Sequence, residues 1–323
     1  CIRDRAMVVA ACNSEVTSPP DAGLSTVSAA GSQDSSGARL FIVGQDLDAI
    51  RGYVSSGCCV RPDGTTAYID FYDLVDPDGA YGGLGLDTDG NPLDTEADWG
   101  SGPASAYKSA TEFDVNYLAI GLSITENEHP GGLDELVAGR RDAEIRQLAL
   151  FANKVDATIL LRIGYEFDGA WNQGYEDGPR YIAAWRRIVD GLRAAGADNV
   201  AFVWQGAAST TDMVIDGGRH DNIRDWYPGD DYVDWLAISW FMHPDEQPGV
   251  DFDFDVMTPA QLGDEVLALA RDVGKPVLIA EAAPQGFDLR DGTTAHHSPI
   301  WDGPGGAGKV QVSNEELGCS GCR

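Results

Sequence analysis

The chain has 323 residues and a net charge of −30, from 52 acidic and 22 basic side chains. A surface so acidic repels phosphate backbones and anionic membranes, so nucleic acid is disfavoured as a partner and a neutral or cationic ligand fits better. Solubility alone also accounts for such a surface. No apolar run reaches the roughly 18 residues of a membrane-spanning helix. The length fits one large α/β domain, which we favour, as well as two smaller ones.

The N-terminus is similar to the end of a bacterial lipoprotein signal. The small-residue pattern VAAC ends at Cys12, and a Ser/Gly/Pro/Ala-rich segment at 13–37 has the composition of a flexible linker. The resemblance implies a lipid on Cys12 and a secreted or cell-envelope location in a bacterium, with membrane contact only through that anchor.

Seven apolar runs follow the linker in chain order, at 39–45, 66–74, 116–124, 157–164, 199–205, 233–241 and 276–281. Nearly continuous apolar runs are typical of parallel strands that are covered on both faces. Amphipathic helices are predicted between them, with apolar stripes within 148–155, 182–192 and 262–273. Alternating strands and helices predict βα units and a parallel sheet.

These elements favour an α/β fold of the (β/α)8 TIM-barrel type, with a doubly wound sheet as the alternative. Polar and aromatic residues stand where several strands end, which is where such barrels build their active sites. The first strand is not followed by the G-x-G-x-x-G of dinucleotide-binding folds. After residue 281 the sequence holds no convincing βα unit, so we expect a barrel without its last one. The predicted divisions are a leader and linker at 1–37, a catalytic barrel at 38–301 and an irregular tail at 302–323.

Two glutamates carry the strongest chemical signal. Glu166 follows the apolar run LLRIGY, and Glu281 ends PVLIAE. On the fourth and seventh parallel strands, these carboxylates would face each other across one cleft, as glycoside hydrolysis requires. Glu281 is then the nucleophile of a retaining mechanism and Glu166 the acid/base. The structural alternative is that each glutamate serves as an ion-pair partner at the barrel mouth, for instance of Arg162.

Other patterns give weaker signals. The six cysteines include a C-x-x-C at 319–322, but no second pair or spaced histidines complete a zinc site. The acidic loops at 87–91 and 251–255 lack the glycine and glutamate of an EF-hand. We therefore predict neither a metal nor a cofactor.

The ordered set of motifs resembles glycoside hydrolase family 26, and most of all its β-1,3-xylanase branch. The motifs are GQDLDAI (44–50), LAIGLSI (118–124), LRIGYEFDGAWN (161–172), the helix and strand at 181–205, YPGDDYVDWLAISWF (227–241) and PVLIAEAAPQG (276–286). The resemblance implies a retaining barrel with its acid/base at Glu166 and its nucleophile at Glu281. Family mannanases commonly have His before the acid/base, where this chain has Tyr165, and the strand-six Tyr of the clan is replaced by Trp240 and Phe241.

We expect an endo-acting, monomeric enzyme on a polysaccharide, with β-1,3-xylan as the first substrate and β-mannan as the second. The alternative is a catalytically inactive carbohydrate-binding barrel. Sugar clefts combine aromatic platforms with a few polar groups, and the loop at 76–108 is expected to shape the groove. The predicted substrate-binding residues are Gln45, Arg162, Tyr165, Asp168, Trp171, Asn172, Trp204, Gln205, Trp240, Phe241 and His243.

Overall fold

The computed structural model describes residues 7–12, 40–56, 60–99, 102–169, 171–207, 222–240, 259–282, 287–288 and 293–294. The predicted tail, with its C-x-x-C, lies outside these residues, as do Phe241 and His243. Of Trp240 the structure describes the backbone, as the last residue of a strand.

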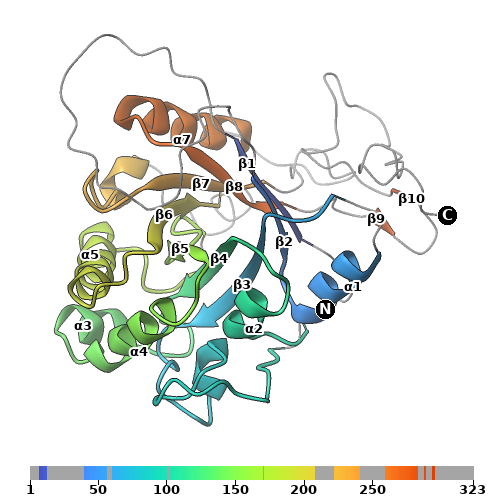
Figure 1. Cartoon of the computed structure of the whole chain (residues 1–323). Coiled ribbons are helices and arrows are strands. Elements are labelled where there is room, and N and C mark those ends of the chain that lie inside the picture. Colours follow the sequence, from blue (N-terminus) through green and yellow to red (C-terminus); the bar gives the residue numbers. More distant parts are fainter. Residues whose placement is uncertain are drawn as a thin grey trace.

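Seven parallel strands form the wall of a barrel, and each coincides with one of the seven predicted runs (Figure 1). They pair in chain order from β2 to β8, which confirms the (β/α) barrel. The run predicted at 66–74 ends earlier, because the Asp70 side chain accepts a hydrogen bond from the Tyr72 N–H and turns the chain. The strands are β2 Leu40–Gly44, β3 Gly64–Asp70, β4 Tyr117–Ser123, β5 Thr158–Ile163, β6 Val200–Gly206, β7 Trp235–Trp240 and β8 Val277–Ala282.

An eighth strand, β1 Met7–Cys12, closes the barrel between β8 and β2. It runs antiparallel to both neighbours, with Ala10 opposite Phe41 on one side and Ile279 on the other. Within the described residues no eighth parallel strand follows β8, and β1 takes the eighth position in the sheet. Strand β1 lies within the segment predicted to be a leader and linker, and cleavage before Cys12 would remove five of its six residues. The leader stays a prediction. Lipidation of Cys12 stays a prediction.

Helices cover the outside of the barrel, with α3, α4 and α5 beside β4 to β6 and α7 beside β7 (Figure 1). The helix predicted near 182–192 is α5. The Asp177 side chain caps its N-terminus, and Pro179 lies in its first turn. None of the helices in the described part of the chain is long and apolar enough to cross a membrane. The helices and short elements are α1 Leu47–Ser56, η1 Ala80–Gly83, α2 Ala106–Thr111, α3 Gly132–Val137, α4 Asp142–Ala152, α5 Gly178–Ala194, η2 Ile223–Trp226, α7 Pro259–Val273, β9 Phe287–Asp288 and β10 Thr293–Thr294.

Successive side chains of each strand point alternately into the barrel and out toward the helices, which divides the core into two parts. Small and branched side chains fill the inside of the barrel, whereas larger ones, such as Phe202 and Trp204 of β6, pack outward against the helices. The inner cluster consists of Ile42, Ala119, Leu160, Val203, Ala237, Leu278 and Ala280.

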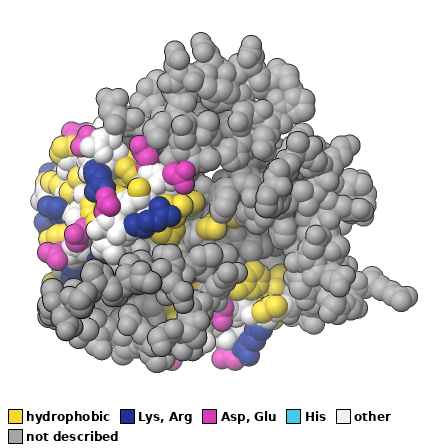
Figure 2. Space-filling view, turned by 90° about the horizontal axis from the view of Figure 1, so that it is seen from above, with side chains coloured by type: hydrophobic (Ala, Val, Ile, Leu, Met, Phe, Trp, Pro, Cys, Tyr) yellow, Lys and Arg dark blue, Asp and Glu magenta, His cyan; other side chains and the backbone are white. Residues whose placement is uncertain are grey.

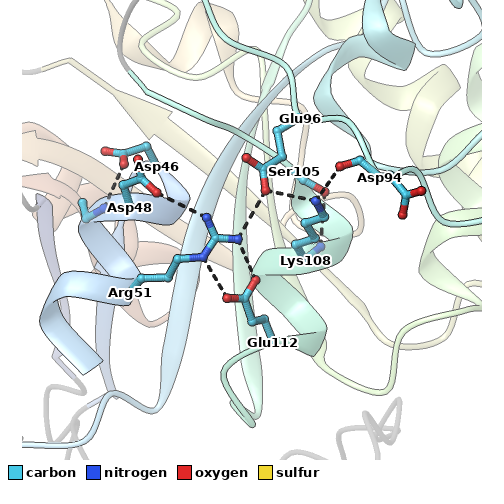
Figure 3. Close-up of polar contacts among 9 residues, drawn as sticks. Asp46, Asp48, Arg51, Asp94, Glu96, Ser105, Lys108 and Glu112 are labelled. Carbon is cyan, nitrogen blue, oxygen red and sulfur yellow. Dashed lines mark hydrogen bonds and ion pairs between the residues drawn. The ribbon is translucent and has the colours of Figure 1, made fainter. Parts of the chain in front are cut away.

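A network of ion pairs ties α1 to the segment between β3 and β4 (Figure 3). The Arg51 guanidinium lies 3.2 Å from Glu96 and 2.8 Å from Glu112, and Lys108 Nζ lies 3.0 Å from the same Glu96 oxygen. Single exposed pairs contribute little, but these four side chains share partners. The network holds the segment that carries Trp99. Acidic and basic side chains also lie next to each other on the described part of the face in Figure 2.

Gly121 of β4 leaves room for Arg162 and Tyr68 inside the barrel. A Cβ at this position would lie 2.6 Å from the Tyr68 ring and 3.0 Å from Arg162 Nη2. We expect Gly121→Ala to lower the free energy of unfolding by about 1 to 3 kcal/mol, measured by urea denaturation. Gly52→Ala is the control, because nothing lies within 4 Å of its Cβ in helix α1, and it should raise stability by about 0.5 to 1 kcal/mol. Equal effects of the two variants would contradict this account.

Candidate active site

An irregularity in β8 aims Glu281 into the barrel mouth. The register with β7 runs from Ile238 opposite Ile279 to Ser239 opposite Glu281, so Ala280 is an extra residue. Leu278 and Ala280 both belong to the inner cluster, and strict alternation would turn the next residue outward. The extra residue restores the inward direction at Glu281, as β-bulges commonly do near active sites.

Arg162 of β5 is fully buried and holds Glu281 in place. Its Nη1 donates to Glu281 Oε1 at 2.6 Å and to Gln205 Oε1 at 3.0 Å. The guanidinium also packs against the rings of Tyr68 and Tyr165, 4.9 and 5.5 Å from their centroids. This satisfies the requirement that a buried charge be paired and hydrogen-bonded.

Two further side chains connect the glutamates. Gln205 Nε2 donates to Glu281 Oε1 at 3.2 Å and to Ser239 Oγ at 2.9 Å, and Ser239 Oγ lies 2.6 Å from Glu166 Oε1. Gln205 is fully buried and Ser239 nearly so. Because three short hydrogen bonds span the path from Glu166 to Glu281, the two carboxylates lie near each other at one rim of the barrel.

Glu166 adopts an unusual backbone conformation just after β5. Its φ is 54°, in the left-handed region that side chains other than glycine rarely occupy. The Asn172 amide donates to the carbonyl oxygens of Glu166 and Tyr165, at 2.8 and 3.4 Å, and Gly169 N–H donates to Glu166 O. The turn is therefore held from several sides, as a strained residue requires.

The surroundings of Glu166 favour its protonated form. Burial raises the pKa of this carboxyl group well above its usual range, and the negative charge of Glu281 raises it further. The Ser239 hydroxyl opposes these effects by hydrogen-bonding the charged form. A carboxyl group that keeps its proton in this way can act as a general acid.

Both glutamates line a single cleft of about 460 Å³. Four of the predicted substrate-binding residues line it too, namely Gln45, Tyr165, Trp171 and Asn172. Trp171 is 41% exposed, so its ring is available to a ligand.

The structure places other predicted residues away from the cleft wall. Trp204 is fully buried and stacks on Phe167 with ring centroids 4.5 Å apart, so its predicted sugar contact is wrong: Gln205 faces inward and its neighbour must face outward. Arg162 and Gln205 are also fully buried, and they hold Glu281 instead of meeting solvent. Asp168 accepts a hydrogen bond from the Ala207 N–H at 2.5 Å, which ties the turn after β5 to the end of β6.

Sequence reasoning missed several cleft residues. Trp99, 52% exposed, lines the cleft from the loop that was expected to shape the groove, and Tyr68 and Asn127 line it as well. Nothing in the local sequence separates Trp99 from a surface aromatic residue. Ser239 was also missed. It lies two residues after Ala237 and four after Trp235, which both belong to the inner side of the strand, so alternation could have placed it inside the barrel.

One cluster of the described residues has the geometry for metal binding. Asp70, Asp73 and His129 offer ligand atoms within 4.8 Å of one another, and each is partly exposed. None of the three lines the cleft that holds the two glutamates.

Comparison with known proteins shows the family of this chain. The sequence profile described as glycosyl hydrolase family 26 matches residues 111–282, more than half of the chain and the span from α2 to Glu281. The chain belongs to glycosyl hydrolase family 26.

Members with similar sequences include two named β-1,3-xylanases. Beta-1,3-xylanase TXYA of a Vibrio species is 30% identical over 254 residues, which cover 78% of this chain and 46% of that protein. The beta-1,3-xylanase of an Alcaligenes species is 28% identical over 256 residues, covering 79% of this chain and 45% of that protein. The chain thus spans about half the length of these relatives.

Solved structures with a similar fold include the Bacillus subtilis mannanase man26, with 16% identity and a TM-score of 0.44 over 73% of this chain and 68% of that one. The Bacteroides ovatus GH26 β-mannanase BoMan26A has 14% identity and a TM-score of 0.42 over 69% and 63% of the two chains.

The raised pKa of Glu166 predicts a pH-dependent stability. A carboxyl group whose pKa is higher in the folded state contributes stability below its unfolded pKa, about 4.3, and loses that contribution as the pH rises through the folded pKa. Glu166→Gln cannot ionise, so we expect a melting temperature about 2 to 4 °C above the parent at pH 8, with no difference at pH 4.

Glu112→Gln is the matched control, because the Arg51 hydrogen bond lowers the pKa of Glu112. This hydrogen bond stabilises the folded parent at neutral pH, and the stabilisation is lost on acidification. The variant should therefore melt at a lower temperature than the parent at pH 8, and the two melting temperatures should become equal at acidic pH. A Glu166→Gln variant that is less stable than the parent at pH 8 would contradict the assignment.

Proposed function

We propose that this chain is a retaining, endo-acting β-glycoside hydrolase. The observation that supports it best is the pair of glutamates in one cleft with opposite surroundings. Glu281 is paired with the buried Arg162, whereas Glu166 is buried beside a like charge and its pKa is raised. Retaining hydrolysis needs this division, with one carboxylate as nucleophile and one carboxylic acid as proton donor.

The proposed reaction has two steps. Glu281 attacks the anomeric carbon while Glu166 protonates the glycosidic oxygen, so one carbon–oxygen bond breaks and a glycosyl-enzyme ester forms. Glu166, now a carboxylate, then takes a proton from a water molecule that attacks the same carbon and releases Glu281. The ion pair with Arg162, at 2.6 Å, holds the Glu281 carboxylate in a fixed position for this attack.

β-1,3-Xylan is the first substrate that we propose, and β-mannan is the second. Two relatives that match more than three quarters of this chain are named β-1,3-xylanases, and Tyr165 stands where mannanases of the family commonly have His. A neutral polysaccharide also suits a chain with a net charge of −30. A polymer of this kind lies outside the cell, so we propose that the enzyme is secreted or held at the cell envelope.

Two tryptophans support an extended sugar-binding cleft. Trp99 and Trp171 are among the most exposed large apolar side chains of the described residues, and both line the cleft with the glutamates. Flat apolar rings beside polar groups are the usual composition of a carbohydrate site. They come from different loops, so a chain of sugars can contact both.

The catalytic assignment is tested on a panel of soluble polysaccharides. We expect the parent to release reducing ends from at least one of them, and Glu166→Gln and Glu281→Gln to lose at least about 10³-fold in kcat. The Glu112→Gln variant serves as the control. Full turnover by either catalytic variant would contradict the mechanism, and binding without turnover by the parent would identify an inactive carbohydrate-binding barrel.

The tryptophans are tested through substrate binding. Trp171→Ala and Trp99→Ala should each raise KM on a long oligosaccharide by about two- to tenfold, since a lost stacking contact is worth about 0.5 to 1.5 kcal/mol. Val137 of α3 is similarly exposed, at 39%, but does not line the cleft, so Val137→Ala should leave KM unchanged. An unchanged KM in both tryptophan variants would rule out stacking.

A further inference from the structure

We propose that Ser239 is a positioning residue that reserves one oxygen of Glu166, Oε2, for the catalytic proton. The inference rests on the proposed function, and it assigns a role to a side chain that the mechanism above does not use. The argument follows from the direction of each hydrogen bond between Arg162 and Glu166.

The guanidinium group fixes the direction of every bond in this series. Arginine is a donor only, so Gln205 Oε1, 3.0 Å from Arg162 Nη1, must be the accepting end of its amide. The other end, Nε2, is then the donor, and its two N–H groups reach Glu281 Oε1 and Ser239 Oγ. This assigns the amide orientation from its partner.

Ser239 therefore accepts from Gln205 and has its own proton left to donate. Its hydroxyl lies 2.6 Å from Glu166 Oε1, a short distance that is typical of an O–H bond to a carboxylate. An oxygen that accepts this bond is disfavoured as the site of the acidic proton, because the hydroxyl oxygen of a carboxylic acid is a much weaker acceptor than its carbonyl oxygen. The proton of Glu166 is consequently held on Oε2.

Glu281 is arranged in the same way. Arg162 Nη1 and Gln205 Nε2 both donate to its Oε1. Within the part of the chain that the structure describes, hydrogen bonds reach only Oε1 of each catalytic glutamate. One series of donors thus occupies Oε1 of both carboxyl groups, which leaves Oε2 of Glu166 to give a proton and Oε2 of Glu281 to attack.

The strand register explains how a serine reaches this position. The irregularity that turns Glu281 inward also places Ser239 directly opposite it on β7. Ser239 is 2% exposed, so water does not compete for its hydroxyl group. A hydrogen bond in these buried surroundings is stronger than one in solvent.

The test is Ser239→Ala, assayed with two substrates of the same sugar. An oligosaccharide needs a proton on its leaving group, whereas a 2,4-dinitrophenyl glycoside does not. We expect kcat/KM to fall about tenfold on the oligosaccharide and less than about twofold on the dinitrophenyl glycoside. Ser239→Thr keeps the hydroxyl group and should recover most of the oligosaccharide activity.

Ser109→Ala is the control for removing a buried serine, because Ser109 lies in α2 away from the cleft, and it should change neither rate. An equal loss on both substrates, or no loss on either, would overturn the proposal. A parent that hydrolyses neither substrate would instead contradict the proposed function.

A second measurement does not depend on turnover. Carbon-13 NMR of the labelled Glu166 carboxyl group follows its titration directly, with Glu166→Gln used to assign the signal. Loss of the Ser239 donor removes a bond to the charged form, so the titration midpoint should move to higher pH in Ser239→Ala and return in Ser239→Thr. An unchanged midpoint in Ser239→Ala would overturn the proposal whatever the activity of the parent.

Discussion

Arg162 places a full positive charge inside the barrel of a chain whose net charge is −30. It is the first donor in the series that orders the active site, and it contacts Glu281, Gln205 and the rings of two tyrosines. Gly121 leaves the space that the guanidinium and Tyr68 occupy. Because an unpaired charge at this depth is costly, the carboxylate of Glu281 and the fold of the barrel mouth stabilise each other.

The same charge explains why two neighbouring glutamates can have different roles. Glu281 forms an ion pair with Arg162. Glu166 is connected to Arg162 through the hydrogen bonds of Gln205 and Ser239. Burial and the nearby carboxylate then raise the pKa of Glu166. In the proposed mechanism, burial of Glu166 and the pairing of Glu281 with the cation distinguish the acid from the nucleophile.

Much of the fold and both glutamates could be predicted from the sequence. The seven parallel strands were readable because each is a short apolar run between helices, and Glu166 and Glu281 stand at the ends of two of them. The prediction for Trp204 was wrong because a position at a strand end was treated as a position in the cleft, although alternation turns it outward.

The remaining features depend on interactions between distant segments. The extra residue in β8 shows only in its register with β7, and Trp99 reaches the cleft through a loop held by Arg51 and Lys108. The pairing of β1 with β2 and β8 joins segments that are far apart in the chain. The composition of residues 7–12 fits an apolar leader as well as a strand, so sequence alone could not decide between them.

The central claim is that Glu281 attacks the sugar while Glu166 supplies the proton from the opposite side of one narrow gap. The most direct measurement is proton NMR of the first product released from a soluble β-linked oligosaccharide, recorded before its anomers interconvert. The account predicts that the β-anomer appears first, because two successive displacements at the same carbon retain its configuration. Initial formation of the α-anomer would show a single displacement by water and would contradict it.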